Sequence, residues 1–500
     1  MTSTAPDTSR DTALDTARDT ITAVATASGP GAVGIVRVSG PKSLALAGAL
    51  FRSSHPKFTG LKPRRLHHGS LVDAAGRVLD EVLVALMPGP GSFTGEDTAE
   101  FYCHGGPAVL RAVLEELLAL GARLANPGEF TLRAFLSGKL DLTQAEAVAE
   151  TIAAPTRAAL HLAQLKLSGA LSRRIADLRA ALESLRARLC LAVDFPDEDV
   201  ECLPLPVLRL EALAVAEDVA RLLASVARAR AWREGVLAVL AGRVNAGKSS
   251  LLNALVGRRR ALVSATPGTT RDYLEEQLDL SGLLVRLVDT AGLRGPEVQA
   301  ESASPLEAVD ARETVDPVDP VDPVEREGQD LSREFMGRAE AVLYVLDAAA
   351  PLHAVDRAAL DGLAPRRALV VLNKCDLPAS RERGGEAEDA ARALGLTCVR
   401  VSAKTGEGLE ELCARLREKL LCACAEPDPD EVAPNARQAS VLAQAQAELV
   451  ALADDAGAGL PYDILGVRLE AACRLLSELT GEIAPDEVLG SIFSKFCLGK

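Results

Sequence analysis

The sequence lacks long hydrophobic runs. None of its 500 residues lies in a stretch that approaches about eighteen uninterrupted apolar residues, the length that a membrane-spanning helix needs. The N-terminal stretch MTSTAPDTSRDTALDTARDT also lacks the apolar centre of a secretory signal peptide. We therefore expect a cytoplasmic protein with no membrane partner.

Cysteine pairs at metal-binding spacing are also missing. Ten cysteines lie at scattered positions, and the closest pair, Cys422 and Cys424, lacks the second half that a zinc ribbon requires. In a cytoplasmic protein such cysteines are expected to be reduced thiols.

The chain is also poor in positive charge, with a formal net charge of -15. This argues against a protein that binds nucleic acid over its whole surface, because phosphate binding depends on clustered Lys and Arg. Two short basic stretches remain, LKPRRLHH at 61–68 and GRRRA at 257–261. Each is either a local RNA contact or a solvated loop.

Changes in composition divide the chain into five segments. Residues 1–20 predict a flexible tail, because they cannot bury enough apolar surface to offset the entropy of ordering. Residues 21–137 alternate short β-like runs with turns and one helical run, which predicts an α+β domain. Residues 138–232 and 425–500 have helical spacing and predict one discontinuous α-helical domain. Residues 233–424 alternate apolar strands with helices, which predicts an inserted α/β domain with a parallel sheet.

A phosphate-binding loop is predicted in AGRVNAGKSS, which follows an apolar strand and precedes a helix. Gly242 and Gly247 let backbone N–H groups close around phosphates, and Lys248 can reach the outer phosphates. The Ser249 hydroxyl can hold Mg²⁺. The expected nucleotide-binding residues here are Asn245, Ala246, Gly247, Lys248, Ser249 and Ser250.

Three further motifs follow in the order that a GTPase requires. In VDTAG, Asp289 can hold the water shell of the metal and the Gly292 amide can sense a γ-phosphate. In NKCD, Asp376 can accept hydrogen bonds from the ring N–H and the amine of guanine, donors that adenine does not offer as a pair. In SAK, backbone amides can bind the guanine oxygen. The expected contacts are Asp289, Thr290, Ala291, Gly292, Asn373, Lys374, Cys375, Asp376, Ser402, Ala403 and Lys404.

The residue that activates water is not evident from these motifs. Ras-type enzymes orient the attacking water with a glutamine just after the DxxG glycine, but here that position is Leu293. Either hydrolysis is absent or another group supplies this function.

Eight stretches of the sequence are distinctive when taken together: GPGAVGIVRVSG, PGPGSFTGEDTAEFYCHGGP, NPGEFTLRAFLSGKLDLTQAEAV, DFPDED, GRVNAGKSSLLNAL, PGTTRD, DTAGLR and LTGEIAPDEVLGSIFSKFCLGK. With them the chain resembles the tRNA modification GTPase MnmE (TrmE) family, from Asp19 to Lys500. The resemblance implies a folate-binding and dimerisation domain, a helical domain in two segments, and an inserted Ras-like P-loop GTPase domain.

The resemblance also implies a homodimer in which K⁺ acts where other GTPases use an arginine finger. Asn245 matches the asparagine that ligates potassium, and Ser264, Thr266 and Thr269 lie in the loop that would complete that site. Thr270 matches the switch threonine on Mg²⁺. The expected nucleotide contacts also include every residue of this loop: Ser264, Ala265, Thr266, Pro267, Gly268, Thr269 and Thr270.

The chain departs from the family after DTAGLR, where an insertion at about 295–323 carries TVDPVDPVDPVE. Alignment of the residues that follow it makes Glu325 the match for the family's water-positioning glutamate, whereas an ungapped count from Asp289 selects Glu301. Proline at every third position favours an extended PPII segment. We expect the insertion to be a tolerated surface tether.

Arg37, Glu100, Lys139 and Lys500 match the family's positions for a 5-formyl- or 5,10-methylene-tetrahydrofolate. With Lys500 as the last residue, we expect no prenylation of Cys497. If nearby cations lower its pKa, the Cys497 thiolate could act as a nucleophile, and otherwise it packs. His104 beside paired glycines is expected to be structural.

The implied function is that of a GTPase that works on certain tRNAs with an MnmG-type FAD protein, in a heterotetramer. Together they would add an aminomethyl or carboxymethylaminomethyl group at C5 of wobble uridine (U34), with GTP hydrolysis driving a conformational cycle. The alternative is a regulatory Era-like GTPase that binds RNA or assists assembly. The residues of the folate site and the FCLGK end argue against that alternative.

Overall fold

The computed structural model describes residues 19–194, 203–259, 275–289, 335–423, 428, 430–483, 485–497 and 499–500. These residues form two compact units. The first unit comprises the described residues of Met1–Ile152, Gln164–Leu223 and Pro434–Lys500, and the second those of Ala153–Ala163 and Ala224–Ala433.

The first unit begins with a seven-stranded sheet in the order β3-β4-β5-β6-β2-β1-β7. Its neighbouring strands pair antiparallel, except that β1 and β7 run parallel. Its core packs α2 and α3 against the sheet around the buried residues Val36, Phe101 and Leu117. The elements are β1 (Ile21–Val24), β2 (Val33–Ser39), α2 (Ser43–Leu50), β3 (Phe51–Ser53), β4 (Leu66–Val72), β5 (Val78–Met87), β6 (Thr98–His104), α3 (Pro107–Ala119), β7 (Arg123–Leu124) and α4 (Glu129–Leu136).

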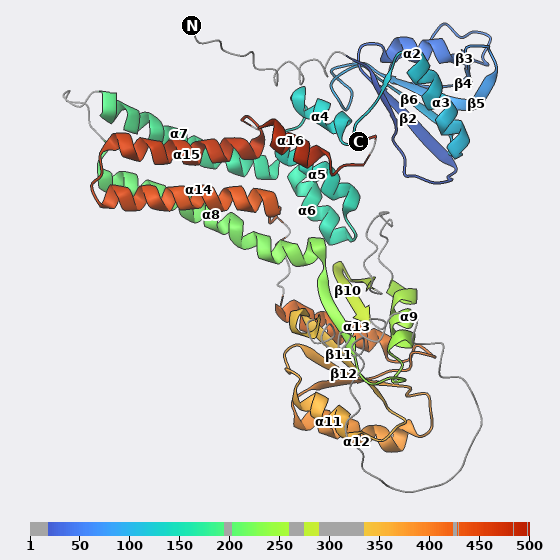
Figure 1. Cartoon of the computed structure of the whole chain (residues 1–500), viewed down its shortest axis with the longest axis vertical. Helices are drawn as coiled ribbons and strands as arrows, with labels where there is room; N and C mark the ends of the chain where they lie inside the picture. The colour runs from blue at the N-terminus through green and yellow to red at the C-terminus, as the bar shows by residue number, and fades with distance from the viewer. Residues whose placement is uncertain are drawn as a thin grey trace, which may run out of the picture. The chain divides into compact units, whose positions relative to one another are not determined.

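Helices follow from two parts of the sequence, one before and one after the α/β region (Figure 1). Most of α6 and the end of α8 belong to the second unit. Helix α14 begins with a capping box, in which the Asn435 side chain accepts from the Gln438 N–H and the Gln438 side chain accepts from the Asn435 N–H. Buried leucines such as Leu182, Leu449 and Leu476 lie along these helices. The helices are α5 (Leu142–Ala153), α6 (Arg157–Leu167), α7 (Ala170–Asp194), α8 (Leu205–Glu234), α14 (Ala436–Gly457), α15 (Tyr462–Thr480) and α16 (Asp486–Phe493).

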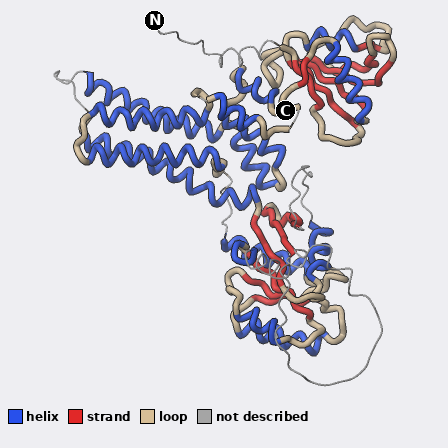
Figure 2. Tube along the Cα trace, viewed as in Figure 1, coloured by secondary structure: helices blue, strands red, loops and turns tan. Residues whose placement is uncertain are grey.

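The second unit contains a six-stranded sheet in the order β13-β12-β11-β8-β10-β9, and helices flank this sheet (Figure 2). All neighbours pair parallel except β9, which is antiparallel to β10. Its elements are β8 (Val236–Ala241), α9 (Lys248–Arg259), β9 (Glu275–Leu280), β10 (Leu283–Asp289), β11 (Ala341–Asp347), α11 (Ala354–Asp361), β12 (Ala368–Asn373), α12 (Ser380–Ala393), β13 (Thr397–Arg400) and α13 (Leu409–Ala423).

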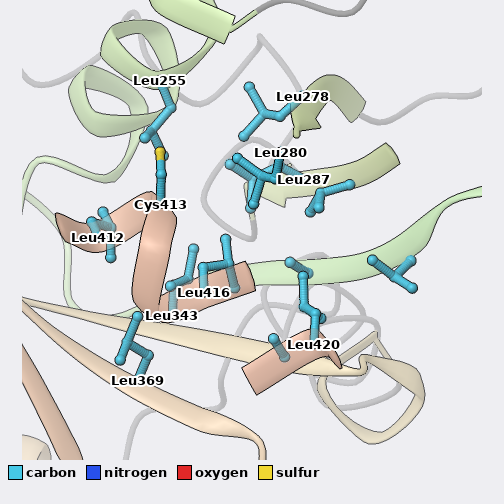
Figure 3. Packing of buried hydrophobic residues seen from close by; sticks show 14 of the residues in the cluster. Leu255, Leu278, Leu280, Leu287, Leu343, Leu369, Leu412, Cys413, Leu416 and Leu420 are labelled. Atoms are coloured by element: carbon cyan, nitrogen blue, oxygen red, sulfur yellow. The ribbon is translucent and has the colours of Figure 1, made fainter. Parts of the chain in front are cut away.

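Both faces of this sheet are buried, because alternate residues of its strands belong to two different cores. Figure 3 shows one of them, where Leu255 of α9 and Leu416 of α13 converge with leucines of the strands such as Leu343. The other core contains Tyr344 and packs against α11 and α12 through Leu360 and Ala391. Strands buried on both faces read as continuous apolar runs, which is why AVLYVLD and ALVVLN were recognisable in the sequence.

The predicted fold class is confirmed. An α+β region, a helical region contributed by two parts of the sequence, and an α/β region inserted between them are all present. No helix among the described residues is long and apolar enough to cross a membrane. The cysteines that the structure describes are all free thiols, as expected.

Candidate functional site

The predicted phosphate-binding loop connects the end of β8 to the start of α9, which begins at Lys248. Gly247 has a φ of 92°, and a Cβ added there would lie 2.3 Å from the Asn373 side chain, so only glycine fits. Asn245 also has a positive φ, of 66°, a region that asparagine tolerates better than most residues. The loop thus has the tight backbone that phosphate binding by N–H groups requires.

The Lys248 side chain lies within this loop instead of extending into solvent. Its Nζ donates to the carbonyl oxygens of Gly242 and Arg243, each at 2.8 Å, and the residue is buried. These carbonyls place the ammonium group beside the backbone that would surround a phosphate. Lys248 is therefore positioned to pair with the outer phosphates of a nucleotide.

Two residues with oxygen ligands meet next to this lysine. The Ser249 hydroxyl, in the first turn of α9, donates to Oδ2 of Asp289 at 2.7 Å. Asp289 ends β10 and is buried. A hydroxyl and a carboxylate are ligands that Mg²⁺ prefers, so this pair fits the metal role predicted for it.

Asn373, the first residue of the NKCD motif, ends β12. Asn373 is buried, its amide donates to the Ala246 carbonyl at 3.0 Å, and its Oδ1 accepts from the Ala403 N–H at 3.1 Å. Asn373 thus ties the phosphate-binding loop to the SAK loop. The structure thus brings the three motifs together.

Lys374 and Asp376 extend this connection. Lys374 Nζ donates to the Asn245 carbonyl and to Oδ2 of Asp347, both at 2.7 Å. Asp376 Oδ1 accepts from the buried Ser402 hydroxyl at 2.7 Å. The carboxylate is therefore held in place, and the lone pairs that remain on its two oxygens can accept from the edge of a base.

The remaining predicted nucleotide contacts surround these groups. Cys375 is half-buried, and burial raises the pKa of its thiol, which keeps it protonated at neutral pH. Ser250 and Lys404 are exposed. The other predicted residues lie outside the described residues: Ser264, Ala265, Thr266, Pro267, Gly268, Thr269, Thr270, Thr290, Ala291, Gly292, Glu301, Glu325 and the insertion at about 295–323.

A second cluster lies in the first unit, where Arg37 of β2 stands directly opposite Glu100 of β6. Arg37 Nε donates to Glu100 Oε1 at 2.8 Å, and the Tyr102 hydroxyl donates to Glu100 Oε2 at 2.7 Å. The Arg37 guanidinium also lies over the rings of Phe93 and Phe130, at 5.9 and 5.7 Å from their centroids. Burial and the Glu100 carboxylate raise the pKa of Tyr102 to about 12, so its hydroxyl stays protonated.

The C-terminal tail reaches this cluster from the far end of the sequence. Arg37 Nη1 donates to the Gly499 carbonyl at 3.3 Å. Burial and the Arg37 charge lower the pKa of Lys500. Arg37, Glu100 and the tail thus come together as the resemblance implied.

Lys139 and Cys497, which the family resemblance also connects with the one-carbon site, are both exposed. Lys139 is exposed and its Nζ donates to the Pro90 carbonyl at 2.8 Å, on the loop that also carries Phe93. Cys497 is an exposed thiol one turn before the terminus. His104 lies at the end of β6 and its ring meets the Asp80 carboxylate at 2.7 Å, which raises the pKa of the imidazole.

Several residues of these sites were not predicted, and three of them show what signal the sequence held. Tyr102 lies two positions after Glu100 on β6, and the period-two alternation of a strand could have indicated that they share a face. Asp347 ends β11 directly opposite Asn373 of the neighbouring strand β12. The only indication in the sequence is that both residues end strands predicted to be parallel. Gly499 contributes its backbone carbonyl, a group that every residue type has, so the sequence did not indicate this contact.

Family models match two parts of the chain. Residues 20–139 match the family described as GTP-binding protein TrmE N-terminus, and residues 142–497 match the MnmE helical domain. The G domain of the T. maritima FeoB iron transporter, a solved structure, is similar with a TM-score of 0.24 and 25% identity, and the match covers 37% of this chain and 98% of that chain.

Curated relatives match over nearly the whole sequence. A tRNA modification GTPase MnmE from Nitratidesulfovibrio vulgaris (strain DP4) is 48% identical over 96% of this chain and 99% of its own length. The protein of the same name from Lawsonia intracellularis is 42% identical with the same coverage. The chain therefore belongs to the tRNA modification GTPase MnmE (TrmE) family.

Proposed function

We propose that this chain is a cytoplasmic GTPase whose activity serves the modification of certain tRNAs at C5 of wobble uridine. The observation that supports guanine nucleotide binding most directly is the set of contacts at the predicted base site. Asn373 joins the phosphate-binding loop to the SAK loop, and Ser402 holds the Asp376 carboxylate. A fixed carboxylate selects guanine because a nucleotide without paired donors would leave that charge unsatisfied.

At the phosphate end, Lys248 and the backbone around Gly247 would bind the phosphate groups of GTP. Ser249, with Thr270 from outside the described residues, would hold Mg²⁺, and Asp289 would hold its water shell. The metal supplies positive charge beside the phosphates when it is bound. The fit rests on the hydroxyl and carboxylate oxygens already lying 2.7 Å apart.

Hydrolysis needs further positive charge and an oriented water. We propose that Asn245 contributes an oxygen ligand to K⁺, together with Ser264, Thr266 and Thr269. Its left-handed backbone places it at the exposed rim of the phosphate-binding loop. Glu325, or Glu301, would orient the water. We propose in addition, from the family resemblance, a homodimer in which two GTPase domains meet across their nucleotides.

The Arg37–Glu100 cluster would bind a 5-formyl- or 5,10-methylene-tetrahydrofolate. The carboxylate can accept from the amino-pyrimidine edge of a pterin, and Arg37, Lys139 or Lys500 can pair with the acidic tail. The exposed Cys497 thiol lies on the same tail and would face the one-carbon group. The bound folate supplies that carbon, and an MnmG-type FAD protein would complete the heterotetramer.

Mass spectrometry of the wobble uridine tests this function directly. Cells with the gene are expected to carry the C5 modification, whereas cells without it, or with only Lys248→Ala, are expected to lack it. Lys248→Ala removes the charge that pairs with phosphate, so it should also lose GTP turnover. Unchanged modification in the deletion strain would contradict the proposed function, and would favour a regulatory GTPase.

A further inference from the structure

The connection between β3 and β4, residues 54–65, is a concentrated basic surface on an acidic chain. No Asp or Glu occurs between Phe51 and Val72, although the formal net charge of the protein is -15. Lys57, Lys62 and Arg65 are exposed on this connection, which we call the β3–β4 loop. The local charge is therefore opposite in sign to that of the whole chain.

These three cations are not neutralised by neighbouring carboxylates. Within the part of the chain that the structure describes, none of Lys57, Lys62 and Arg65 takes part in an ion pair. By contrast, Arg123 and Arg133 of the same unit each pair with two or more carboxylates. Uncompensated cations side by side repel one another, and an anionic partner would relieve this repulsion.

The loop that carries the cations is held against the sheet. The Phe58 ring meets the buried Phe51 ring at 5.6 Å between centroids and the His67 ring at 5.7 Å. The Lys62 N–H donates to His67 Nε2 at 2.8 Å, and the Lys57 N–H donates to His55 Nδ1 at 3.1 Å. The backbone at both lysines is thus fixed, so less entropy is lost when a partner binds.

The same residues enclose a shallow hollow of about 470 Å³. Lys57, Lys62 and Arg65 line it, together with the rings of His55, Phe58 and His67. A hollow with cations and an exposed aromatic ring suits a phosphate and its sugar better than it suits an apolar ligand.

We propose that the β3–β4 loop is a contact surface for the sugar-phosphate backbone of tRNA. The inference rests on the proposed function, which supplies tRNA as the substrate, and adds where on the chain it is held. Phosphate contacts position a nucleic acid without reading its sequence, so this surface would orient different tRNAs in the same way. It accounts for a local basic surface on a chain whose net charge opposes RNA binding elsewhere.

The test compares two full-length variants that lose the same charge. The loop variant carries Lys57→Ala, Lys62→Ala and Arg65→Ala. The control carries Lys42→Ala, Arg111→Ala and Arg174→Ala, three exposed cations of the first unit that lie outside the loop. Thermal melting of both checks the fold. Fluorescence anisotropy with a labelled tRNA transcript then measures Kd at several salt concentrations from 50 to 200 mM, a range over which the loss of phosphate contacts changes the affinity strongly.

We expect the loop variant to bind tRNA about 10- to 100-fold more weakly than the unaltered protein at about 0.1 M salt. The slope of log K against log salt should fall by about 2 to 3, because each lost phosphate contact removes about 0.7–0.9. The control variant should bind like the unaltered protein. Equal affinity of the loop variant and the control would overturn the inference.

A measurement on the unaltered protein keeps the inference testable if the loop variant misfolds. Bound tRNA should slow acetylation of Lys57 and Lys62 and leave Lys42 unchanged, and absence of this protection would overturn the inference. Loss of binding to vesicles of anionic lipid with tRNA binding intact would overturn it in favour of a membrane surface. If the unaltered protein itself fails to bind tRNA at 50 mM salt, the tRNA part of the proposed function fails instead.

Discussion

The hydroxyl of Ser402 donates a hydrogen bond of 2.7 Å to Oδ1 of Asp376. Ser402 is fully buried, so this bond fixes the carboxylate proposed to read guanine. We expect Ser402→Ala to weaken GDP and GTP binding by about tenfold, since hydrogen bonds to charged groups contribute about 1.5–3 kcal/mol. Titration with a fluorescent GDP measures this. Unchanged affinity would show that Asp376 is fixed by other contacts.

Asp376→Asn should change which base is preferred. The amide offers one donor and one acceptor where the carboxylate offers two acceptors, so it cannot satisfy both guanine donors. We expect GTP affinity to fall by at least about a hundredfold, with a gain for xanthosine triphosphate, whose base has an oxygen in place of the amine. Competition of each nucleotide against fluorescent GDP tests this, and retained preference for GTP would contradict the role proposed for Asp376.

Asn245 is expected to determine the response to K⁺. In the unaltered protein we expect GTP turnover in K⁺ to exceed that in Na⁺ by at least about tenfold, or about 1.4 kcal/mol in barrier. Asn245→Gly keeps the left-handed backbone and removes only the amide, so turnover in the two ions should become equal to within about twofold. Val244→Ala, at the exposed neighbouring position, is the matched control and should keep the K⁺ advantage.

The nucleotide site was predictable because each of its motifs is local. A glycine, a lysine and a serine adjacent in sequence are adjacent in space, and the carboxyl ends of parallel strands bring Asp289 and Asn373 to one edge of the sheet. The pairing of Lys374 with Asp347 was not predicted, since it depends on β11 and β12 ending in register. Strand order is a tertiary property that no single motif contains.

The contacts in the cluster around Arg37 were, by contrast, mostly not predictable from sequence motifs. Arg37 and Gly499 are separated by 462 positions, and their contact joins a side chain to a backbone carbonyl. No pattern of residue types signals such a contact, so only the family resemblance placed the tail near Arg37. The period-two alternation of β6 could have added Tyr102, because local geometry alone puts it beside Glu100.

Acid should destabilise the first unit through Asp19 and Glu129. Burial acts to raise the pKa of each carboxyl, but hydrogen bonds from Arg123 and Arg133 outweigh it and hold both pKa values below their usual range. A lowered folded-state pKa contributes stability that is complete above the unfolded value of about 4 and is lost as the pH falls through the folded value. We therefore expect the first unit to melt at lower temperature as the pH falls from about 5 to about 3.

Glu129→Gln tests the origin of this acid sensitivity. The variant should melt a few degrees lower at pH 6, because a hydrogen-bonded buried charge contributes about 1.5–3 kcal/mol. It should also lose less stability than the unaltered protein on acidification. Glu115→Gln, at an exposed position of α3, is the control and should follow the unaltered protein. Scanning calorimetry measures both, and parallel pH curves for all three proteins would exclude this network as the cause.

Gly499→Ala should separate the tail from the Arg37 cluster. Gly499 has a φ of 87°, and an added Cβ would lie 2.2 Å from the Val24 carbonyl oxygen, so the tail must move. We expect 5-formyl-tetrahydrofolate affinity and wobble-uridine modification to fall by at least about tenfold, with GTP turnover in K⁺ kept. Gly490→Ala in α16, where an added Cβ meets nothing within 4 Å, is the matched control. Full folate affinity and modification in Gly499→Ala would mean that the seated tail is not part of the one-carbon site.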